Sequence, residues 1–298
     1  MKILITGKDG QLGWELQRSV AGLGDIVATG RQELDLCNPA GIRQLVRSIR
    51  PDVVLNTAAY NAVDRAEADP DVALKVNGVA PGLLAEECRN LGALLIHFST
   101  DYVFDGNKSS AYSEEDETAP LSVYGRSKLA GEHAVRAVKG RALIFRTAWL
   151  YSAHGDNFVR TMRRLARQRG ELSVVNDQTG TPTWVKPLSE AMTKICQVAG
   201  SARGRALGEG APVYHATCSG ETTRYEFVRA ILNDLASKAP GERIAKLTPI
   251  SAADYPAQAR RPAYSVLSNA KLERDFGLRL PEWRSAFNRF TTEEPSIS

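Results

Sequence analysis

The sequence predicts an α/β fold built on a doubly wound parallel sheet. Short apolar runs alternate with longer helical patterns through the first half of the chain, and these runs are apolar throughout rather than at every second residue. Strands of this kind are typical of a parallel sheet that helices cover on both faces. A length of 298 residues leaves room for a second, smaller lobe.

The elements of the sheet domain follow one another in strict alternation. Strands are expected where β-branched and aliphatic residues form continuous runs, at 2–6, 25–29, 53–59, 93–100 and 142–151. Helices are expected where apolar residues recur at three- and four-residue spacing, at 10–24, 41–49, 73–92 and 123–132.

The second half is less regular. Helices are expected at 157–168, 184–200 and 221–236, with a Gly- and Ala-rich connection at 201–212. After these, we expect short strands and loops and a frayed polar tail at 291–298. We interpret residues 1–150 as the sheet domain, onto which elements from about 172–200 fold back. Residues 151–298 then form mainly a second lobe.

Composition narrows the functional classes. The formal net charge is +4, and no cluster of Lys and Arg interleaved with aromatics suggests a nucleic-acid partner. No run of eighteen apolar residues predicts a membrane span, and the first residues are strand-like rather than a signal peptide. The four cysteines include no C-x-x-C pair. We therefore expect a cytoplasmic protein with reduced thiols and a small-molecule ligand.

A glycine-rich turn follows the first strand. Gly7, Gly10 and Gly13 are spaced three apart, and Gln11 and Leu12 stand between the last two. Glycines let backbone amides approach a pyrophosphate, and the helix N-terminus adds partial positive charge. Because the motif joins a strand to a helix at the start of a βαβ unit, it predicts a dinucleotide site. We therefore expect a dinucleotide-binding Rossmann domain over 1–150 and a mainly substrate-binding lobe over 151–298.

The end of the second strand bears on the choice of dinucleotide. An acidic residue there would bind the ribose 2′-hydroxyl of NAD, but this chain has Arg31 in that region. A guanidinium suits the 2′-phosphate of NADP. NADPH is therefore the expected cofactor, with NADH as the alternative.

Tyr124 and Lys128 stand four residues apart in the helical stretch VYGRSKLAGE. Residues at this spacing share one face of a helix. A tyrosine has a pKa of about 10, and a neighbouring cation lowers it toward the range of acid–base catalysis. The pair is common by chance, so its meaning depends on the remaining motifs.

Taken in order, TGKDGQLG, STDYVFDG and YGRSK make the chain resemble the extended short-chain dehydrogenases/reductases over nearly its full length. The segments NTAAYNAVDRAE, FSTDYVFDG, FRTAWLY and NDQTGTPT are similar to one branch, the dTDP-4-dehydrorhamnose reductases. This resemblance implies reduction of the C4 ketone of a dTDP-sugar by NADPH, the last step of dTDP-L-rhamnose formation.

The resemblance also implies a catalytic set of three residues. Tyr124 would donate a proton to the carbonyl oxygen and Thr100 would stabilise the developing charge by a hydrogen bond. Lys128 would hold the nicotinamide ribose and lower the pKa of Tyr124.

Further ligand contacts are implied by the same resemblance. Cofactor contacts are expected from the glycine loop and from positions after the second and third strands: Gly7, Gly10, Gln11, Leu12, Gly13, Arg31, Asp35, Leu36, Ala58, Ala59, Tyr60 and Asn77, together with Tyr124 and Lys128. Substrate contacts are expected from Val63, Asp64, Thr100, Asp101, Tyr102, Trp149, Asn157, Phe158, Gln178, Thr181, Pro182 and Arg260 or Arg261.

Glu15 and Glu190 match acidic positions that some relatives use in a magnesium-linked dimer. The resemblance thus suggests a homodimer with Mg²⁺ at its interface.

Two alternatives stay open on the sequence. One is another nucleotide-sugar enzyme, a 4,6-dehydratase or 4-epimerase, although Asp101 and Tyr102 leave the dehydratase acid pair incomplete. The other is a non-catalytic NADP-binding subunit resembling the β-subunit of methionine adenosyltransferase.

Overall fold

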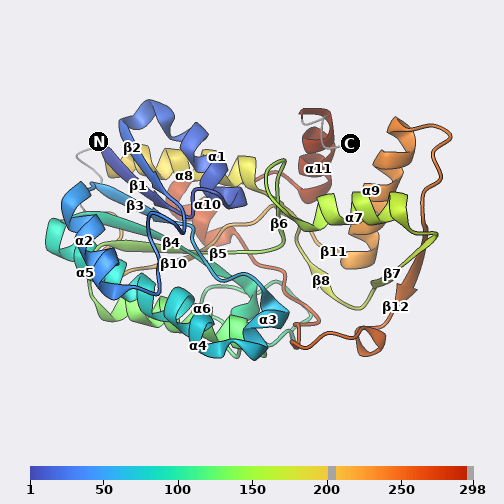
Figure 1. Ribbon diagram of the computed structural model, residues 1–298, viewed down its shortest axis with the longest axis horizontal. Helices are drawn as coiled ribbons and strands as arrows, with labels where there is room; N and C mark the ends of the chain where they lie inside the picture. The colour runs from blue at the N-terminus through green and yellow to red at the C-terminus, as the bar shows by residue number, and fades with distance from the viewer. Residues whose placement is uncertain (201–205, 294–298) are drawn as a thin grey trace.

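A six-stranded parallel sheet forms the centre of the molecule (Figure 1). The computed structural model describes residues 1–200 and 206–293. The strand order of the sheet is β10-β5-β4-β3-β1-β2, and every neighbouring pair of strands is parallel. The strands are β1 Lys2–Thr6, β2 Asp25–Thr29, β3 Val53–Asn56, β4 Leu94–Thr100, β5 Ala142–Thr147 and β10 Val213–His215.

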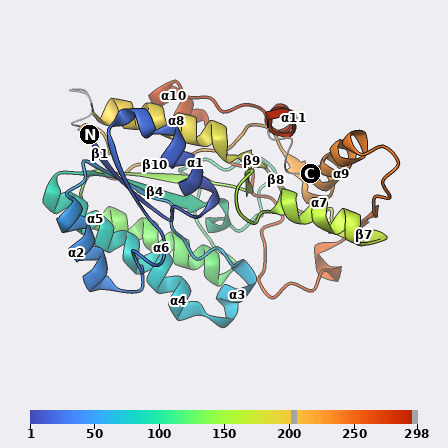
Figure 2. The ribbon, with the colours of Figure 1, turned by 45° about the horizontal axis from the view of Figure 1, so that its top comes forward.

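Helices cover both faces of this sheet, as the apolar strands predict. Along β1, Ile3 and Ile5 belong to one hydrophobic core and Leu4 to the other. The first core is closed by α1 Gln11–Ser19 and α8 Val185–Ala199, and the second by α2 Pro39–Ile49, α5 Ala80–Leu91 and α6 Val123–Ala137 (Figure 2). The doubly wound fold is confirmed.

The order of the strands reverses between β1 and β3. In open α/β sheets, ligands bind outside the carboxyl ends of the strands at such a switch point. The glycine loop follows β1 at this position, and the segment 57–62 follows β3. The fold therefore brings both predicted cofactor segments to one edge of the sheet.

The second lobe lies beyond the carboxyl edge of the sheet (Figure 1). It contains the packed helices α7 Phe158–Gln168 and α9 Arg224–Lys238 and the parallel pair β7 Glu171–Val175 and β12 Lys246–Ile250. Short pairs link it to the rest: β6 Leu150–Tyr151 with β9 Thr183–Trp184, and β8 Thr179–Gly180 with β11 Thr222–Thr223.

The predicted helix at 73–92 is interrupted near its start. It comprises α4 Pro70–Leu74, one π-helical turn over Lys75–Val79, and α5. The short helix α3 Val63–Ala68 precedes it. The π turn contains Asn77, whose side chain bonds the backbone of Tyr60 and the hydroxyl of Ser127.

Two helices near the C-terminus were not predicted. These are α10 Ala270–Phe276 and α11 Trp283–Glu293, where only strands and loops were expected. In α11 the buried residues Trp283, Ala286, Phe287 and Phe290 do recur at helical spacing, so the pattern was present but the segment was too short and aromatic to stand out. Residues 294–298 of the expected tail and residues 201–205 lie outside the described part of the chain.

No helix among the described residues is long and apolar enough to cross a membrane.

Candidate active site

The glycine loop and the segment after β3 pack against each other. Gly7 has a φ of +76°, and a Cβ atom there would lie 2.8 Å from the Ala58 backbone. A Cβ on Gly13 would lie 2.1 Å from the carbonyl oxygen of Gly7. Both positions therefore require glycine for the turn and for the close approach of helix to strand.

The predicted catalytic residues meet in one pocket. Thr100 ends β4, while Tyr124 and Lys128 lie on successive turns of α6, whose first turn is capped by Ser122. The pocket has a volume of about 230 Å³. It is lined by Gln11, Leu12, Thr57, Ala59, Asn61, Phe98, Ser99, Thr100, Asp101, Tyr124, Lys128, Thr147, Ala148, Trp149 and Leu150.

Burial, rather than the lysine charge, governs the phenol of Tyr124. Removal from water raises its pKa, a hydrogen bond with Thr100 lowers it, and the Asp101 carboxylate raises it further. The prediction that Lys128 lowers the pKa of Tyr124 is wrong for this structure. The partly buried phenol holds its proton at neutral pH, which is the form that a proton donor requires.

Lys128 is buried and its ammonium is directed at the backbone. Its Nζ donates to the carbonyl oxygen of Phe98 at 2.5 Å. Burial lowers the pKa of Lys128 to about 8, and the nearby Glu132 carboxylate opposes this shift. The side chain is therefore a cation at neutral pH that loses its charge in mildly alkaline solution.

A buried ion pair stands behind Lys128 and was not predicted. The Glu132 carboxylate accepts two bonds from Arg146, at 2.9 and 2.7 Å, and one from the hydroxyl of Ser99 at 2.5 Å. Both charged residues are less than 5% exposed. The sequence carried a signal, because Glu132 lies four residues after Lys128 on the same helical face and Arg146 lies within an apolar strand.

Asp101 is a buried acid that lines the pocket. The Thr100 hydroxyl donates to it at 3.0 Å, and Ser265 also forms a hydrogen bond with it. Burial nevertheless raises the pKa of Asp101 to about 6. Asp101 lines the catalytic pocket, and its predicted substrate contact stays a prediction.

The pocket has the features that a dinucleotide requires. Among the described residues, the side-chain oxygens of Gln11 and Thr147 are buried without a hydrogen-bond partner, and both residues line the pocket. Thr147 lies directly beside Thr100 in the register of β5 and β4. Unpaired buried polar atoms are costly unless a ligand satisfies them, so the residues present fit a bound nicotinamide cofactor.

The region expected to hold the adenosine is exposed. Arg31 follows β2 and is exposed, as is Asp35, whose carboxylate accepts from the amide of Cys37 at 2.9 Å; Leu36 is buried in the core. Lys8 in the glycine loop pairs with Glu33, which also accepts from the amide of Gly30. Lys8 is thus a second cation at this end of the site that the sequence analysis missed.

Asn77 lies behind the pocket rather than in it. Asn77 is completely buried. Its side-chain oxygen accepts from the backbone amide of Tyr60 at 2.8 Å, and its side-chain nitrogen donates to the carbonyl oxygen of Tyr60 at 3.1 Å. It also donates to the hydroxyl of Ser127 at 3.0 Å. Asn77 thus ties the segment after β3 to the α6 turn between Tyr124 and Lys128, and its predicted cofactor contact stays a prediction.

A larger cleft of about 1150 Å³ adjoins the catalytic pocket, and Asn61 lines both. Its walls come from both lobes. They include the predicted substrate residues Val63, Tyr102, Phe158, Gln178, Arg260 and Arg261, and also Arg224, Tyr255 and residues of α7, β7 and the segment 252–261.

Three predicted substrate contacts are used by the protein itself. Asp64 pairs with Arg261 at 2.6 Å. The Asn157 side chain caps α7 and donates to the carbonyl of Ser152, and Thr181 is buried and donates to the carbonyl of Gly220. Polar side chains near a cleft satisfy backbone groups as readily as ligands, and their residue types alone do not separate the two roles.

Trp149 sits at the boundary of the pocket and the second lobe. It has a φ of +44°, an unusual conformation for a large side chain, and lines the catalytic pocket. A Cβ on Gly180 would come within 2.6 Å of its ring, and the Arg224 guanidinium lies 4.0 Å from the ring centroid. Trp149 is thereby fixed in place beside the site, as a wall residue requires.

The structure gives no support to the predicted magnesium site. Glu15 on α1 and Glu190 on α8 do line one surface hollow, despite their separation in sequence. However, the described residues contain no group of three or more His, Cys, Asp or Glu side chains that could hold a metal ion.

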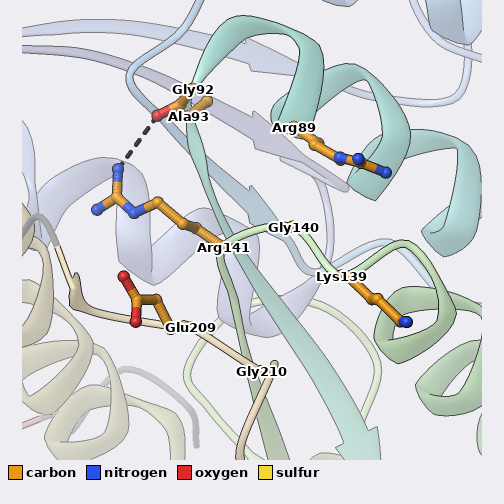
Figure 3. A pocket seen from close by; sticks show the side chains of 8 residues that line it. All are labelled: Arg89, Gly92, Ala93, Lys139, Gly140, Arg141, Glu209 and Gly210. Atoms are coloured by element: carbon orange, nitrogen blue, oxygen red, sulfur yellow. Dashed lines mark hydrogen bonds between the residues drawn. The ribbon is translucent and has the colours of Figure 1, made fainter.

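A further hollow of about 300 Å³ lies at the opposite edge of the sheet, beside the residues that precede β4 and β5 (Figure 3). There Arg141 donates to the carbonyl of Gly92 at 3.1 Å, and Arg89 donates to that of Val138 at 3.0 Å. These carbonyls belong to the C-terminal ends of α5 and α6, so the arginines satisfy helix ends. No predicted site residue lines this hollow.

Comparisons with known proteins agree with this arrangement. Residues 1–295 match the family model described as "RmlD substrate binding domain". A dTDP-4-dehydrorhamnose reductase of Burkholderia thailandensis is 47% identical over 290 residues, covering 96% of each chain. One from Escherichia coli K12 is 41% identical, covering 98% of each chain.

A solved structure has the same fold over the whole length. The dTDP-4-dehydrorhamnose reductase of Bacillus anthracis, determined in complex with NADP, superposes with a TM-score of 0.89 at 34% identity, covering 98% of this chain and 99% of that one. Since the family model and the relatives span nearly every residue described above, the chain belongs to the dTDP-4-dehydrorhamnose reductase family.

Proposed function

We propose that this protein reduces the C4 ketone of dTDP-4-dehydro-6-deoxy-L-mannose to give dTDP-L-rhamnose, with NADPH as reductant. The observation that carries the proposal is the junction of two cavities. The pocket holding Thr100, Tyr124 and Lys128 opens beside the glycine loop, and the large cleft that adjoins it has room for a nucleotide. The relatives named for this reaction support it.

The residues of the pocket have separate roles in this reaction. When bound, NADPH supplies the hydride. Tyr124 donates its proton to the carbonyl oxygen. The Thr100 hydroxyl, which donates to Asp101 in the free protein, turns to donate a hydrogen bond to the same oxygen as it gains charge. Lys128, a cation at neutral pH, holds the nicotinamide ribose.

The alternatives fit the pocket less well. A 4,6-dehydratase needs a second acid beside the strand-end threonine, and the residue after Asp101 is Tyr102, whose hydroxyl accepts from Arg224. A regulatory subunit has no need for a proton donor buried beside a cofactor loop.

The test is to mix the protein with this keto sugar, also called dTDP-6-deoxy-L-lyxo-4-hexulose, and with NADPH or NADH. The loss of the absorbance of the reduced nicotinamide is then followed. We expect turnover with NADPH and a fall of at least 10³-fold in kcat for Tyr124→Phe, with NADPH binding retained. Cofactor binding without turnover would overturn the reductase and favour the regulatory subunit.

The homodimer and its magnesium ion stay predictions. Light scattering with and without a chelator tests both, and Glu190→Gln, on the exposed face of α8, should abolish any effect of the metal.

A further inference from the structure

Arg224 holds an unusual position at the edge of the substrate cleft. It is the first residue of α9, and its guanidinium lies 4.0 Å from the ring centroid of Trp149 and 5.4 Å from that of Phe158. Its Nη2 donates to the hydroxyl of Tyr102 at 3.3 Å. Two aromatic rings and a phenol therefore fix the direction of this cation.

The charge of Arg224 has no direct counterpart. Within the described residues, no carboxylate forms an ion pair with Arg224, whereas Arg261 in the same cleft is paired with Asp64. Stacking on aromatic rings engages the faces of a guanidinium and leaves its N–H edges available. Of its donors, one bonds Tyr102. Arg224 is thus a half-buried, oriented cation with donors to spare.

Arg224 lies between the catalytic residues and the large cleft. Tyr102 contacts Arg224 through its hydroxyl and meets the ring of Tyr124 edge-on at a centroid distance of 5.8 Å. Arg224 also lines the large cleft and lies near enough to Asp101 to lower its pKa, against the larger effect of burial. Arg224 therefore stands where the catalytic pocket widens into the cleft.

We propose that Arg224 binds the diphosphate of the nucleotide sugar and that Trp149 and Phe158 hold it ready to do so. The inference rests on the proposed function. A sugar whose C4 carbonyl reaches Tyr124 carries its diphosphate on C1, across the ring and toward the cleft. Arginine forks match phosphate oxygens, and an oriented one loses less entropy on binding.

The experiment measures binding rather than turnover. Dissociation constants for dTDP and for thymidine are determined by calorimetry for the wild type, Arg224→Gln and Arg224→Lys, each in the presence of NADPH. Arg164→Gln is the matched charge control, because Arg164 is an exposed α7 arginine whose guanidinium bonds Gln168 and does not line the cleft. Arg261→Gln tests a second of the arginines that line the cleft, which also include Arg260. An unchanged NADPH dissociation constant verifies that each variant is folded.

We expect Arg224→Gln to weaken dTDP binding by about 10- to 100-fold and thymidine binding by less than twofold. Arg224→Lys keeps the charge without the fork and should fall between. Arg164→Gln should match the wild type. If Arg224→Gln does not fold, the lysine variant still carries the comparison.

Three results would overturn the proposal: equal losses for dTDP and thymidine in Arg224→Gln, a loss of the diphosphate preference in Arg261→Gln instead, or a wild type that binds both ligands alike. The proposed reaction is judged separately. A protein that binds dTDP through Arg224 but does not reduce the keto sugar would refute the reaction and leave this inference standing.

Discussion

Asp64 and Arg261 meet at 2.6 Å beside the substrate cleft, joining α3 of the sheet domain to a segment 197 residues later. The amide of Ala259 donates to the same carboxylate at 3.0 Å. Asp64 therefore holds the segment 252–261, which forms one wall of the cleft, against the sheet domain.

Asp64→Asn should loosen this wall without touching the chemistry. The pair is partly exposed, so we expect a rise of about two- to fivefold in KM for the dTDP-sugar and little change in kcat. Steady-state kinetics and hydrogen exchange over 252–261 measure the two effects. A fall in kcat of tenfold or more would instead place Asp64 at the reacting sugar.

Glu132→Gln should be strongly destabilising, because it leaves Arg146 as an unpaired buried cation. Loss of one partner of a buried pair costs about 3–5 kcal/mol in the free energy of unfolding. The double variant Glu132→Gln with Arg146→Met removes both charges and should recover part of that loss. Denaturant unfolding measures each variant, and a double variant no more stable than the single one would contradict the ion-pair explanation.

Asp101→Asn should make the protein without ligand more stable at pH 7.5. Burial raises the pKa of Asp101 from 3.8 to about 6, so the folded chain binds more protons than the unfolded chain between these values. The carboxylate therefore destabilises the fold fully above pH 6 and not at all below pH 3.8. At about 1.4 kcal/mol per unit, the gain at pH 7.5 is about 1–3 kcal/mol.

The measurement is the difference in unfolding free energy between Asp101→Asn and the wild type from pH 3.5 to 8. It should be near zero at the acid end and level off above pH 6. A constant difference would mean that the effect comes from the lost hydrogen bond with Thr100 rather than from the charge.

The sequence was sufficient for the sheet and for the residues whose spacing is local. The strands from β1 to β5 follow from continuous apolar runs. The face shared by Tyr124 and Lys128 follows from helical spacing, and the glycine loop follows from a contiguous motif. Parallel strands then bring their carboxyl ends to one edge, so Thr100 could be assigned to the same site as the helix.

Other features depend on contacts between distant segments. The pairing of Asp64 with Arg261, the stacking of Arg224 on Trp149 and the burial of Glu132 with Arg146 join residues whose separation follows no period. The pKa of Tyr124 was misjudged for the same reason. The spacing to Lys128 is visible in the sequence, while the desolvation that outweighs the charge is a property of the packed pocket.

Arg31→Gln should lower the preference for NADPH. Arg31 is exposed at the end of β2, where it is free to meet a 2′-phosphate, and Lys8 nearby is paired with Glu33. Loss of one charge-assisted contact corresponds to about a 10- to 100-fold weaker NADPH complex, with NADH binding changed less than twofold. Nicotinamide fluorescence titration measures both constants, and Arg136→Gln, an exposed arginine of α6, is the control for charge alone. Equal weakening of both cofactors would mean that Arg31 supports the loop rather than selects the phosphate, and Lys8 would then be the residue to test.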